Sequence, residues 1–579
     1  MTQLLRPLTS FQPVGLPASL LMPDQNLKLP FHDPAAPATG PRRTHARRLR
    51  LAVLGIPPPV ALAFGLATAQ VLTVDGRLGP AETALAVLSG FAIYWLALST
   101  VTSAIGFFRR PRPQAHAAAP GLRIAILLPM YGEDPQETIG RAADLLAALK
   151  GPGHAHRFSL HVLSDTRDPR AVLTETATVA AISEARPNLV IRYRHRLKNR
   201  DYKQGNIRDW ITRQGSAYDA ALILDADSRM GRRTVLTLAD ALVADPGCAL
   251  VQSLPLVDAG ETVWQRLQSF ANRVYGGPLG RGYASWTGSD GNFMGHNAMV
   301  RVKAFATCAG LPQLSGPRPL GGVILSHDFV EAALLRRAGW GVRILPEAAD
   351  SHEEAPSSLV GHIKRDARWC QGNLQHVRLL FGAAGLNPIS RFHLFSGAMA
   401  YLGAVVWAAI LILWASAGSE EVYFLTPGTG NGAGWLMVTV MALLFAPKLM
   451  GIADHILRVG LPRGRRLAFA GAVLTETLVS ALVAPVMMVQ HLKIILRALT
   501  GVDTGWPQHG HGPIPWRDLI RFHAVETGLG LILLAAIIAG GLSLWALPVA
   551  VGLVLSVPVS KLAASDGHWI PVASTGRLR

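Results

Sequence analysis

Long apolar runs on either side of a polar segment constrain the fold of this chain more than any other feature. The run from Leu51 to about Thr73 and the run from Thr83 to Phe108 are each long enough to cross about 30 Å of hydrocarbon. Further apolar runs fill most of 392–560. Because the bilayer interior excludes irregular polar segments, we predict one soluble domain over 109–391, inserted between membrane helices.

Arginine residues border the first two runs and predict their orientation. Before the first run lie Arg42, Arg43, Arg47, Arg48 and Arg50, and after the second lie Arg109, Arg110 and Arg112. Basic residues flank the cytoplasmic ends of membrane helices. The two helices of 51–108 are therefore expected to enter and leave from the cytoplasm, behind a flexible cytoplasmic tail over 1–50. The net charge of +18 then indicates contact with membrane lipids and no nucleic-acid partner.

Short β-rich runs alternate with helical stretches across 109–391. The β-rich runs are 123–129, 158–163, 189–195, 220–227 and 248–255, and the helical stretches include 136–150, 205–213 and 231–244. Strands that alternate with helical crossovers form a mostly parallel sheet, so the predicted fold class is α/β. The only cysteines, Cys248, Cys308 and Cys370, are widely spaced, which excludes a zinc cluster and a disulfide framework.

The C-terminal apolar region, 392–560, is predicted to hold about five spans and to be followed by a tail over 561–579. The loop 417–433 carries Glu420 and Glu421 but no Lys or Arg. Cytoplasmic loops carry an excess of basic residues, so this loop is expected to be periplasmic.

Two basic loops enclose the apolar run 468–490, and the second of them, 491–525, is expected to be cytoplasmic. A single crossing cannot have both ends in the cytoplasm. We therefore expect this span to be broken or re-entrant near Pro485, the alternative being that the charge rule fails here. The last long run, Thr527 to Val559, is expected to form two spans with a tight turn near Leu547–Pro548.

The strand run 220–227 ends in Asp225-Ala226-Asp227. Carboxylates at the carboxyl end of a buried parallel strand point into the crevice where α/β sheets bind ligands. A divalent cation that carries a diphosphate would suit this pair. The alternative is that one Asp only caps the following helix.

Polar residues also follow the other strands. Tyr131 and Glu133 lie in the turn after the first strand, where a nucleotide base could bind, although such a turn is also ordinary chain punctuation. Asp165 ends the second strand and is either a ligand or a turn former. Lys203 opens the helix after the third strand and is either a phosphate ligand or a solvated side chain.

Three later segments add candidates. Asn297 lies in a turn of small residues that a substrate could approach. His327-Asp328 precedes an amphipathic helix. Asp328 could cap this helix, or it could point into the crevice and act as a base. The last segment, Arg365-Asp366-Ala367-Arg368-Trp369, offers an aromatic surface for a sugar and cations for a phosphate, or an amphipathic helix at the membrane surface.

Taken in order, these motifs resemble those of membrane-embedded, processive family-2 glycosyltransferases of the cellulose and hyaluronan synthase type. That family has an Asp after the second strand, a DxD motif, a TED-like Asp and a (Q/R)xxRW helix. The matching residues are Asp165, Asp225-Ala226-Asp227, Ser326-His327-Asp328 and Arg365-Asp366-Ala367-Arg368-Trp369. The stretches LSHDFVEAALLRRAGW and RWCQGNLQH are similar to the OpgH family of glucan-forming glucosyltransferases in particular. The resemblance covers about 100–560.

This resemblance implies a GT-A glycosyltransferase domain that transfers glucose from UDP-glucose, with inversion, to a growing glucan. For the OpgH family the product is the β-1,2-linked backbone of osmoregulated periplasmic glucans, made at the inner membrane, and export of the glucan is implied as well. The implied partners are UDP-glucose, the glucan, membrane lipids, an acyl carrier protein and a periplasmic OpgG-like glucan-modifying protein.

The resemblance also implies roles for the candidate residues. Asp328 is the catalytic base, and Asp227 with Asp225 holds Mg²⁺ or Mn²⁺. The donor nucleotide contacts Tyr131, Glu133, Asp165, Lys203 and Asp225, whereas Arg365, Arg368, Trp369, Asn297 and His327 serve the diphosphate or the acceptor. The alternatives are a cellulose- or hyaluronan-type synthase, a glucosyltransferase with a lipid acceptor, and a non-catalytic glycan transporter.

Overall fold

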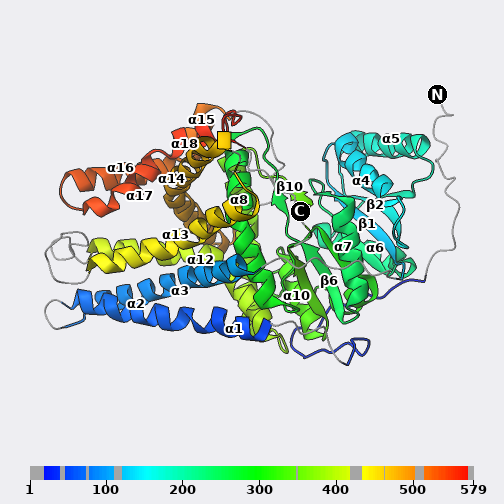
Figure 1. The fold of residues 1–579 in the computed structure, drawn as a ribbon, viewed down its shortest axis with the longest axis horizontal. Helices are drawn as coiled ribbons and strands as arrows, with labels where there is room; N and C mark the ends of the chain where they lie inside the picture. Colours follow the sequence, from blue (N-terminus) through cyan, green and yellow to red (C-terminus); the bar gives the residue numbers. More distant parts are fainter. Residues whose placement is uncertain are drawn as a thin grey trace.

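A computed structural model describes residues 18–38, 46–73, 77–109, 120–346, 348, 350–416, 433–461, 463–502 and 514–571. The apolar helices extend to one side of a domain that contains the β-sheets (Figure 1). The long helix α8 (Val263–Thr287) lies between these two parts (Figure 1). The order of elements along the chain agrees with a domain inserted between apolar helices.

A seven-stranded sheet in the order β3-β2-β1-β4-β8-β6-β9 forms the centre of the domain. Its strands are β1 (Arg123–Met130), β2 (Arg157–Ser164), β3 (Ile191–His195), β4 (Ala220–Ile223), β6 (Cys248–Ser253), β8 (Ala298–Arg301) and β9 (Gly341–Leu345). Only β8 runs antiparallel to its neighbours in this sheet. The predicted α/β fold with a mostly parallel sheet is confirmed.

Helices cover both faces of this sheet. One face packs against α4 (Pro135–Leu149), α5 (Pro169–Ala185) and α7 (Arg232–Ala244), and the other against α6 (Tyr202–Gln214), α9 (Val302–Cys308) and α10 (His327–Arg337). Successive residues of β1 alternate between the two cores: Ile126 belongs to the first and Leu127 to the second. A strand buried on both faces needs a continuous apolar run, which explains the sequence of β1.

A second, three-stranded sheet lies beside the carboxyl ends of the main sheet. It consists of β5 (Arg229–Met230), β10 (Ser351–Glu353) and β7 (Leu256–Val257), in that order. The helix α11 (Leu359–Gly382) follows β10 and carries the Arg365–Trp369 motif. This sheet therefore connects the segment after Asp227 to the start of α11.

The segment 18–38 lies across the domain, so the flexible tail predicted there is wrong for these residues. Met22 belongs to the core formed with α6, α9 and α10. The indole of Trp340 donates a hydrogen bond to Asp33 at 2.8 Å, and Arg337 donates to Gln25 at 2.9 Å. The segment has no periodic pattern because it packs as an extended chain through isolated anchors. The other residues of the predicted tail that precede Ala46 lie outside the described residues.

Five helices in the described part of the chain are long and apolar enough to cross a membrane, or up to seven if each bent pair is one span. The five are α1 (Ala46–Gly55) together with α2 (Pro57–Leu72), then α3 (Pro80–Phe108), α12 (Pro388–Ser416), α13 (Ala433–Arg458) and α14 (Arg466–Leu499). The bent pairs are α15 (Trp516–Phe522) with α16 (Ala524–Ile538), and α17 (Leu547–Val554) with α18 (Ser556–Ala563). The predicted periplasmic loop, 417–433, lies outside the described residues except for Ala433, the first residue of α13.

The helix α14 runs without interruption through Pro485, so the break expected there is wrong. Pro485 packs against α17, where a Cβ on Gly552 would lie 2.5 Å from its Cγ. The first turns of α14 contact α8 through Phe469, and its last turns contact α11 through Ile494. Both basic ends of α14 are therefore next to the domain, which explains how two basic loops can enclose one apolar run.

The turn in the last apolar run lies earlier than predicted. The helix α16 ends at Ile538 and α17 begins at Leu547, so Pro548 lies in the first turn of α17. Proline at the start of a helix costs no hydrogen bond, because the N–H groups of the first turn have no partner within the helix. The pairs α15–α16 and α17–α18 are bent by 67° and 51°.

Candidate active site

The residues predicted to bind the donor converge at the carboxyl ends of β1 and β4. The ammonium group of Lys203, in the first turn of α6, forms an ion pair with Asp225. The same ammonium donates a hydrogen bond to the carbonyl oxygen of Gly295 at 2.8 Å. Burial opposes ionisation of Asp225, but Lys203 and His296 hold its pKa below the ordinary value. Lys203 thus connects the Asp225-Ala226-Asp227 turn to the segment before β8.

The pKa of the neighbouring carboxylate, Asp227, is shifted in the opposite direction from that of Asp225. Burial, together with the charge of Asp225, raises the pKa of Asp227 to about 6. A cation bound between two such carboxylates would relieve this repulsion. The described residues contain no cluster of three or more His, Cys, Asp or Glu side chains that could hold a metal ion. The donor set therefore fits Mg²⁺ or Mn²⁺ of the kind that takes one or two carboxylates and completes its shell with phosphate oxygens and water.

Asp328 lies in the first turn of α10, and Ser326 occupies the N-cap position. Asp328 is therefore not the cap residue of this helix. Gly295 packs against it with φ +91°, a backbone conformation open to glycine, and a Cβ at Gly295 would lie 3.3 Å from the Asp328 carboxylate. Burial, and then the charge of Glu331, raise the pKa of Asp328, against the opposing effect of His327.

His327 pairs with Glu331 one helical turn further along, at 3.2 Å. Burial alone would lower the pKa of His327, but the charge of Glu331 and its hydrogen bond raise it overall. The imidazole lies among the groups that set the charge around Asp328, together with Lys203. A raised pKa at Asp328 suits a carboxylate that has to accept a proton near neutral pH.

The helix α11 contributes Arg365, Arg368 and Trp369. The guanidinium of Arg365 lies 4.7 Å from the centroid of the Trp369 ring, and the Trp369 side chain is half exposed. The charges of Glu353 and Asp227 act on Arg365, whose Nε is buried with no hydrogen-bond partner among the described residues. Burial, and then Arg365, lower the pKa of Arg368 to about 10. Two neighbouring cations of this kind favour an anionic ligand.

The residues predicted to contact the nucleotide base lie on the other side of Lys203. Burial is the main cause of a raised pKa at Glu133, to which the charge of Asp225 adds. Asp165 forms a bidentate ion pair with Arg196, and both N–O distances are 2.6 Å. A cavity of about 510 Å³ opens beside this pair. Tyr131 and Asp165 directly follow Met130 and Ser164, which pair across the sheet, and the Tyr131 N–H donates a hydrogen bond to the Glu133 carboxylate.

Asn297 is not brought together with these residues. Its side chain is fully buried and donates hydrogen bonds to Ser351 Oγ at 2.9 Å and to the His352 carbonyl at 3.3 Å. It adopts φ +50° at the start of β8. Asn297 therefore joins the main sheet to the second sheet.

Three functional neighbours escaped sequence reasoning. His296 pairs with Glu353 at 3.1 Å beside Asp225, and although burial would lower its pKa, Glu353 and Asp225 raise it to about 9. Arg196 directly follows β3, and Asp165 directly follows the neighbouring strand β2. This shared position at two strand ends is a signal that could have identified Arg196 from the sequence. His296 had no such signal in the sequence. Its partner Glu353 lies on β10, 50 residues after β8, so the two side chains meet only in the fold.

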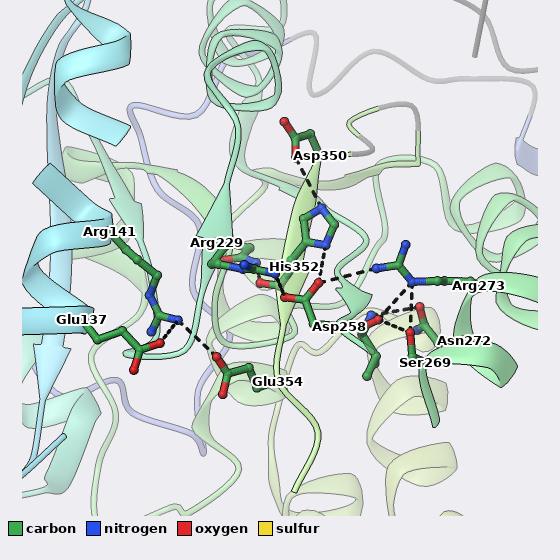
Figure 2. A network of polar contacts seen from close by, with 12 residues as sticks. Glu137, Arg141, Arg229, Asp258, Ser269, Asn272, Arg273, Asp350, His352 and Glu354 are labelled. Atoms are coloured by element: carbon green, nitrogen blue, oxygen red, sulfur yellow. Dashed lines mark hydrogen bonds and ion pairs between the residues drawn. The ribbon is translucent and has the colours of Figure 1, made fainter. Parts of the chain in front are cut away.

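The third is Arg141 on α4, which contacts the Asp225-Ala226-Asp227 turn. Its Nη2 donates a hydrogen bond to the Ala226 carbonyl at 2.8 Å. Its Nη1 lies 3.1 Å from both Glu137 and Glu354 (Figure 2). Figure 2 also shows the adjoining network in which His352 lies between Asp258 and Asp350. Arg141 therefore fixes the peptide between the two carboxylates.

The variant Arg141→Gln is expected to raise the Mg²⁺ concentration needed for half-maximal activity about tenfold, as losses behind a metal site do. A metal titration of UDP release measures this effect. The matched control is Arg186→Gln. It removes an exposed ion pair, at 2.6 Å, between Arg186 and Asp144, and Asp144 lies on α4 like Arg141. An equal shift in both variants would contradict a specific effect on the turn.

Comparison with known proteins identifies the family of this chain. The family described as Glycosyl transferase family group 2 matches residues 221–449. The glucans biosynthesis glucosyltransferase H of Rhodopseudomonas palustris strain BisA53 is 39% identical over 95% of this chain and 81% of its own length. The protein of the same description from Vibrio cholerae is 38% identical, over 95% of this chain and 80% of its own.

Among solved structures, the chain is similar to the mannosyltransferase PcManGT from Pyrobaculum calidifontis, in complex with GDP-Man and Mn²⁺. The identity is 14%, the TM-score is 0.44, and the match covers 72% of this chain and 99% of that one. The family is shown instead by the sequence identity and coverage of the two relatives named above. The chain is a glycosyltransferase and belongs to the glucans biosynthesis glucosyltransferase H family.

Proposed function

We propose that this glycosyltransferase moves glucose from UDP-glucose to a growing glucan, with inversion at the anomeric carbon. The proposed product is the β-1,2-linked backbone of osmoregulated periplasmic glucans. The observation that carries the proposal is the convergence of Lys203, Asp225 and Asp328 around the Gly295 backbone. This arrangement supports the proposal because carboxylates that could hold a diphosphate-binding cation and a carboxylate that could act as base lie close to one backbone segment.

The donor would bind across the carboxyl ends of β1, β2 and β4. Asp165, held by Arg196, and Glu133 would supply acceptors for the N–H group of uracil, and Tyr131 contacts Glu133 through its backbone N–H. Lys203 and Asp225 would lie between these acceptors and the reacting carbon. Arg365 and Arg368 supply positive charge to the leaving diphosphate.

Asp227 and Asp225 would hold Mg²⁺ or Mn²⁺. When bound, the ion neutralises the negative charge that develops on the departing UDP. Asp328 accepts the proton of the acceptor hydroxyl as that oxygen forms its bond to the anomeric carbon. The bond from this carbon to the diphosphate oxygen breaks on the opposite side, so UDP leaves with the electron pair and the configuration inverts.

Incubation of the purified protein in lipid with labelled UDP-glucose, followed by linkage analysis, tests the product. A 1,2-linked glucan supports the proposal. Labelled glucolipid, or a 1,4-linked polymer, would replace it with a lipid-acceptor enzyme or a cellulose-type synthase. Absence of turnover with intact UDP binding would favour a non-catalytic transporter.

Trp369 is proposed as the platform beneath the acceptor sugar. Trp369→Ala is expected to weaken acceptor stacking by about 1 kcal/mol and to leave UDP-glucose affinity unchanged. Glucan yield and UDP-glucose binding, measured on the same preparation, separate the two effects. If nucleotide affinity falls as steeply as glucan yield, Trp369 supports the donor site through its contact with Arg365.

The proposed location is the inner membrane of a bacterium, with the catalytic domain in the cytoplasm. The five or more apolar helices support a membrane protein, and UDP-glucose is a cytosolic donor. A cysteine at Gly430, outside the described residues, is expected to react with an impermeant maleimide added to spheroplasts, whereas one at Arg170 is not. The opposite labelling pattern would overturn this orientation.

The proposed partners include an acyl carrier protein on the cytoplasmic side and an OpgG-like protein that modifies the glucan in the periplasm. The helices beside the domain would give the glucan a route out as it grows. Affinity capture from the native membrane with each candidate protein tests this part, and capture of neither would remove it.

A further inference from the structure

The acceptor helix α11 is joined to two apolar helices by a single carboxylate. Asp366 lies between Arg365 and Arg368, and its two oxygens have different partners. The Tyr401 hydroxyl, on α12, donates to Oδ1 at 3.0 Å. The His491 imidazole, on α14, donates through Nε2 to Oδ2 at 2.6 Å. The Tyr401 and His491 rings also meet edge to face, with centroids 5.1 Å apart.

This polar contact lies within an apolar interface of the same three helices. Ala367 and Cys370 of α11 pack against Tyr401 of α12 and Ile494 of α14 in one buried cluster. Apolar packing alone tolerates small sliding and rotation of a helix, because it is not directional. A charge-assisted hydrogen bond is directional and short, so the contact at Asp366 fixes the rotation of α11.

The rotation of α11 matters because of the side chains next to Asp366. Trp369 lies three residues further along the helix, on a neighbouring part of its surface. Arg365, one residue before Asp366, stacks on Trp369 at 4.7 Å. A rotation of the helix would therefore move the aromatic surface and both arginines together.

Building on the function proposed above, we propose that Asp366 is a positioning residue for the acceptor. With Tyr401 and His491 it holds the Trp369 surface in register with α12 and α14, so that the glucan end meets both the catalytic domain and the apolar helices in one orientation. Burial disfavours ionised Asp366, but His491, with a smaller contribution from Tyr401, keeps its pKa below the ordinary value. The carboxylate is thus available as the acceptor of both hydrogen bonds.

The experiment compares Tyr401→Phe, His491→Leu and His491→Gln with the wild type in lipid. The first two variants each remove one donor, whereas the Gln amide can still donate to Asp366. The matched control is Tyr283→Phe, because the Tyr283 hydroxyl contacts a histidine, His393, on α12 at 3.1 Å but touches no residue of the acceptor motif. Glucan length, the KM for UDP-glucose and hydrogen exchange of 359–382 are measured for each.

Tyr401→Phe and His491→Leu are expected to shorten the glucan about threefold or more, the change that loss of one hydrogen bond produces. Amide exchange of α11 should become faster, and the KM for UDP-glucose should stay within about twofold. His491→Gln and Tyr283→Phe should resemble the wild type. Wild-type length and exchange in Tyr401→Phe, or an equal loss in Tyr283→Phe, would overturn the role of Asp366.

The exchange measurement separates this proposal from the proposed reaction. If the wild type makes no glucan from UDP-glucose while Tyr401→Phe and His491→Leu still loosen α11, the reaction is wrong and the contact holds. If the wild type makes glucan and no variant alters its length, the reaction holds and the positioning role is wrong. A rise in the KM for UDP-glucose that matches the loss of glucan would also overturn the role, since it would locate the effect at the donor.

Discussion

Asp328→Asn is expected to melt normally, to bind UDP-glucose with unchanged affinity and to make almost no glucan. A positioned base contributes about 100-fold to 10,000-fold in rate, and asparagine cannot accept the proton of the acceptor hydroxyl. The side chain lies in the first turn of α10, where Ser326 is the N-cap residue, so the substitution removes no cap. Initial rates of UDP release and a thermal melt in detergent are the measurements.

Asp518→Asn is the control for this variant, because Asp518 also lies in the first turn of a helix, α15, and is exposed. It should keep wild-type turnover. A melt-competent Asp328→Asn that retains more than about a tenth of wild-type turnover would disprove the assignment. Glu331, one helical turn further along and paired with His327, would then be the next candidate base.

The second large effect is expected for Asp227→Asn, which should abolish metal-dependent UDP binding. A carboxylate that is raised in pKa to about 6 by burial and by Asp225 gains most from a bound cation. Calorimetry of UDP with and without Mg²⁺ measures the effect in both proteins. Equal UDP affinity under all four conditions would refute the metal assignment.

The raised pKa also gives this prediction a pH dependence. Metal binding requires ionised Asp227, so Mg²⁺ affinity in the wild type should fall as pH decreases through about 6. The same shift means that ionised Asp227 destabilises the metal-free protein above that pH, since its folded pKa exceeds the unfolded value. Asp227→Asn should therefore melt at the same or a higher temperature than the metal-free wild type at pH 7.5.

The five predicted β-rich runs correspond to β1, β2, β3, β4 and β6, whereas β8 and β9 of the main sheet were not predicted. The run 123–129 became β1, and the apolar composition of this strand follows from its burial on both faces. The Asp225-Ala226-Asp227 turn and Asp328 were both located by their place after a strand or before a helix. Such predictions succeed because periodicity and helix starts depend on residues within a few positions of each other.

Interactions between distant segments were missed where no local pattern marks them. Residues 18–38 contact the domain through separate anchors such as Met22 and Asp33, which have no helical or strand spacing. Asn297 looked like a substrate contact, yet its amide hydrogen-bonds to Ser351 and His352. The side on which a residue lies in a turn depends on backbone angles that its neighbours in sequence do not reveal.

The sequence by itself determined the apolar segments and the alternation of strands and helices in the first half of the domain, and it supplied the candidate residues for the chemistry. Only the tertiary structure decided which charges meet: Asp165 with Arg196, Asp225 with Lys203, and Asp366 with His491. It also decided that α14 continues through Pro485 and contacts the domain at both ends. The physical reason is that hydrophobic periodicity depends on spacing along the chain, whereas a hydrogen bond or ion pair depends on distances in space that are set by the packing of remote elements.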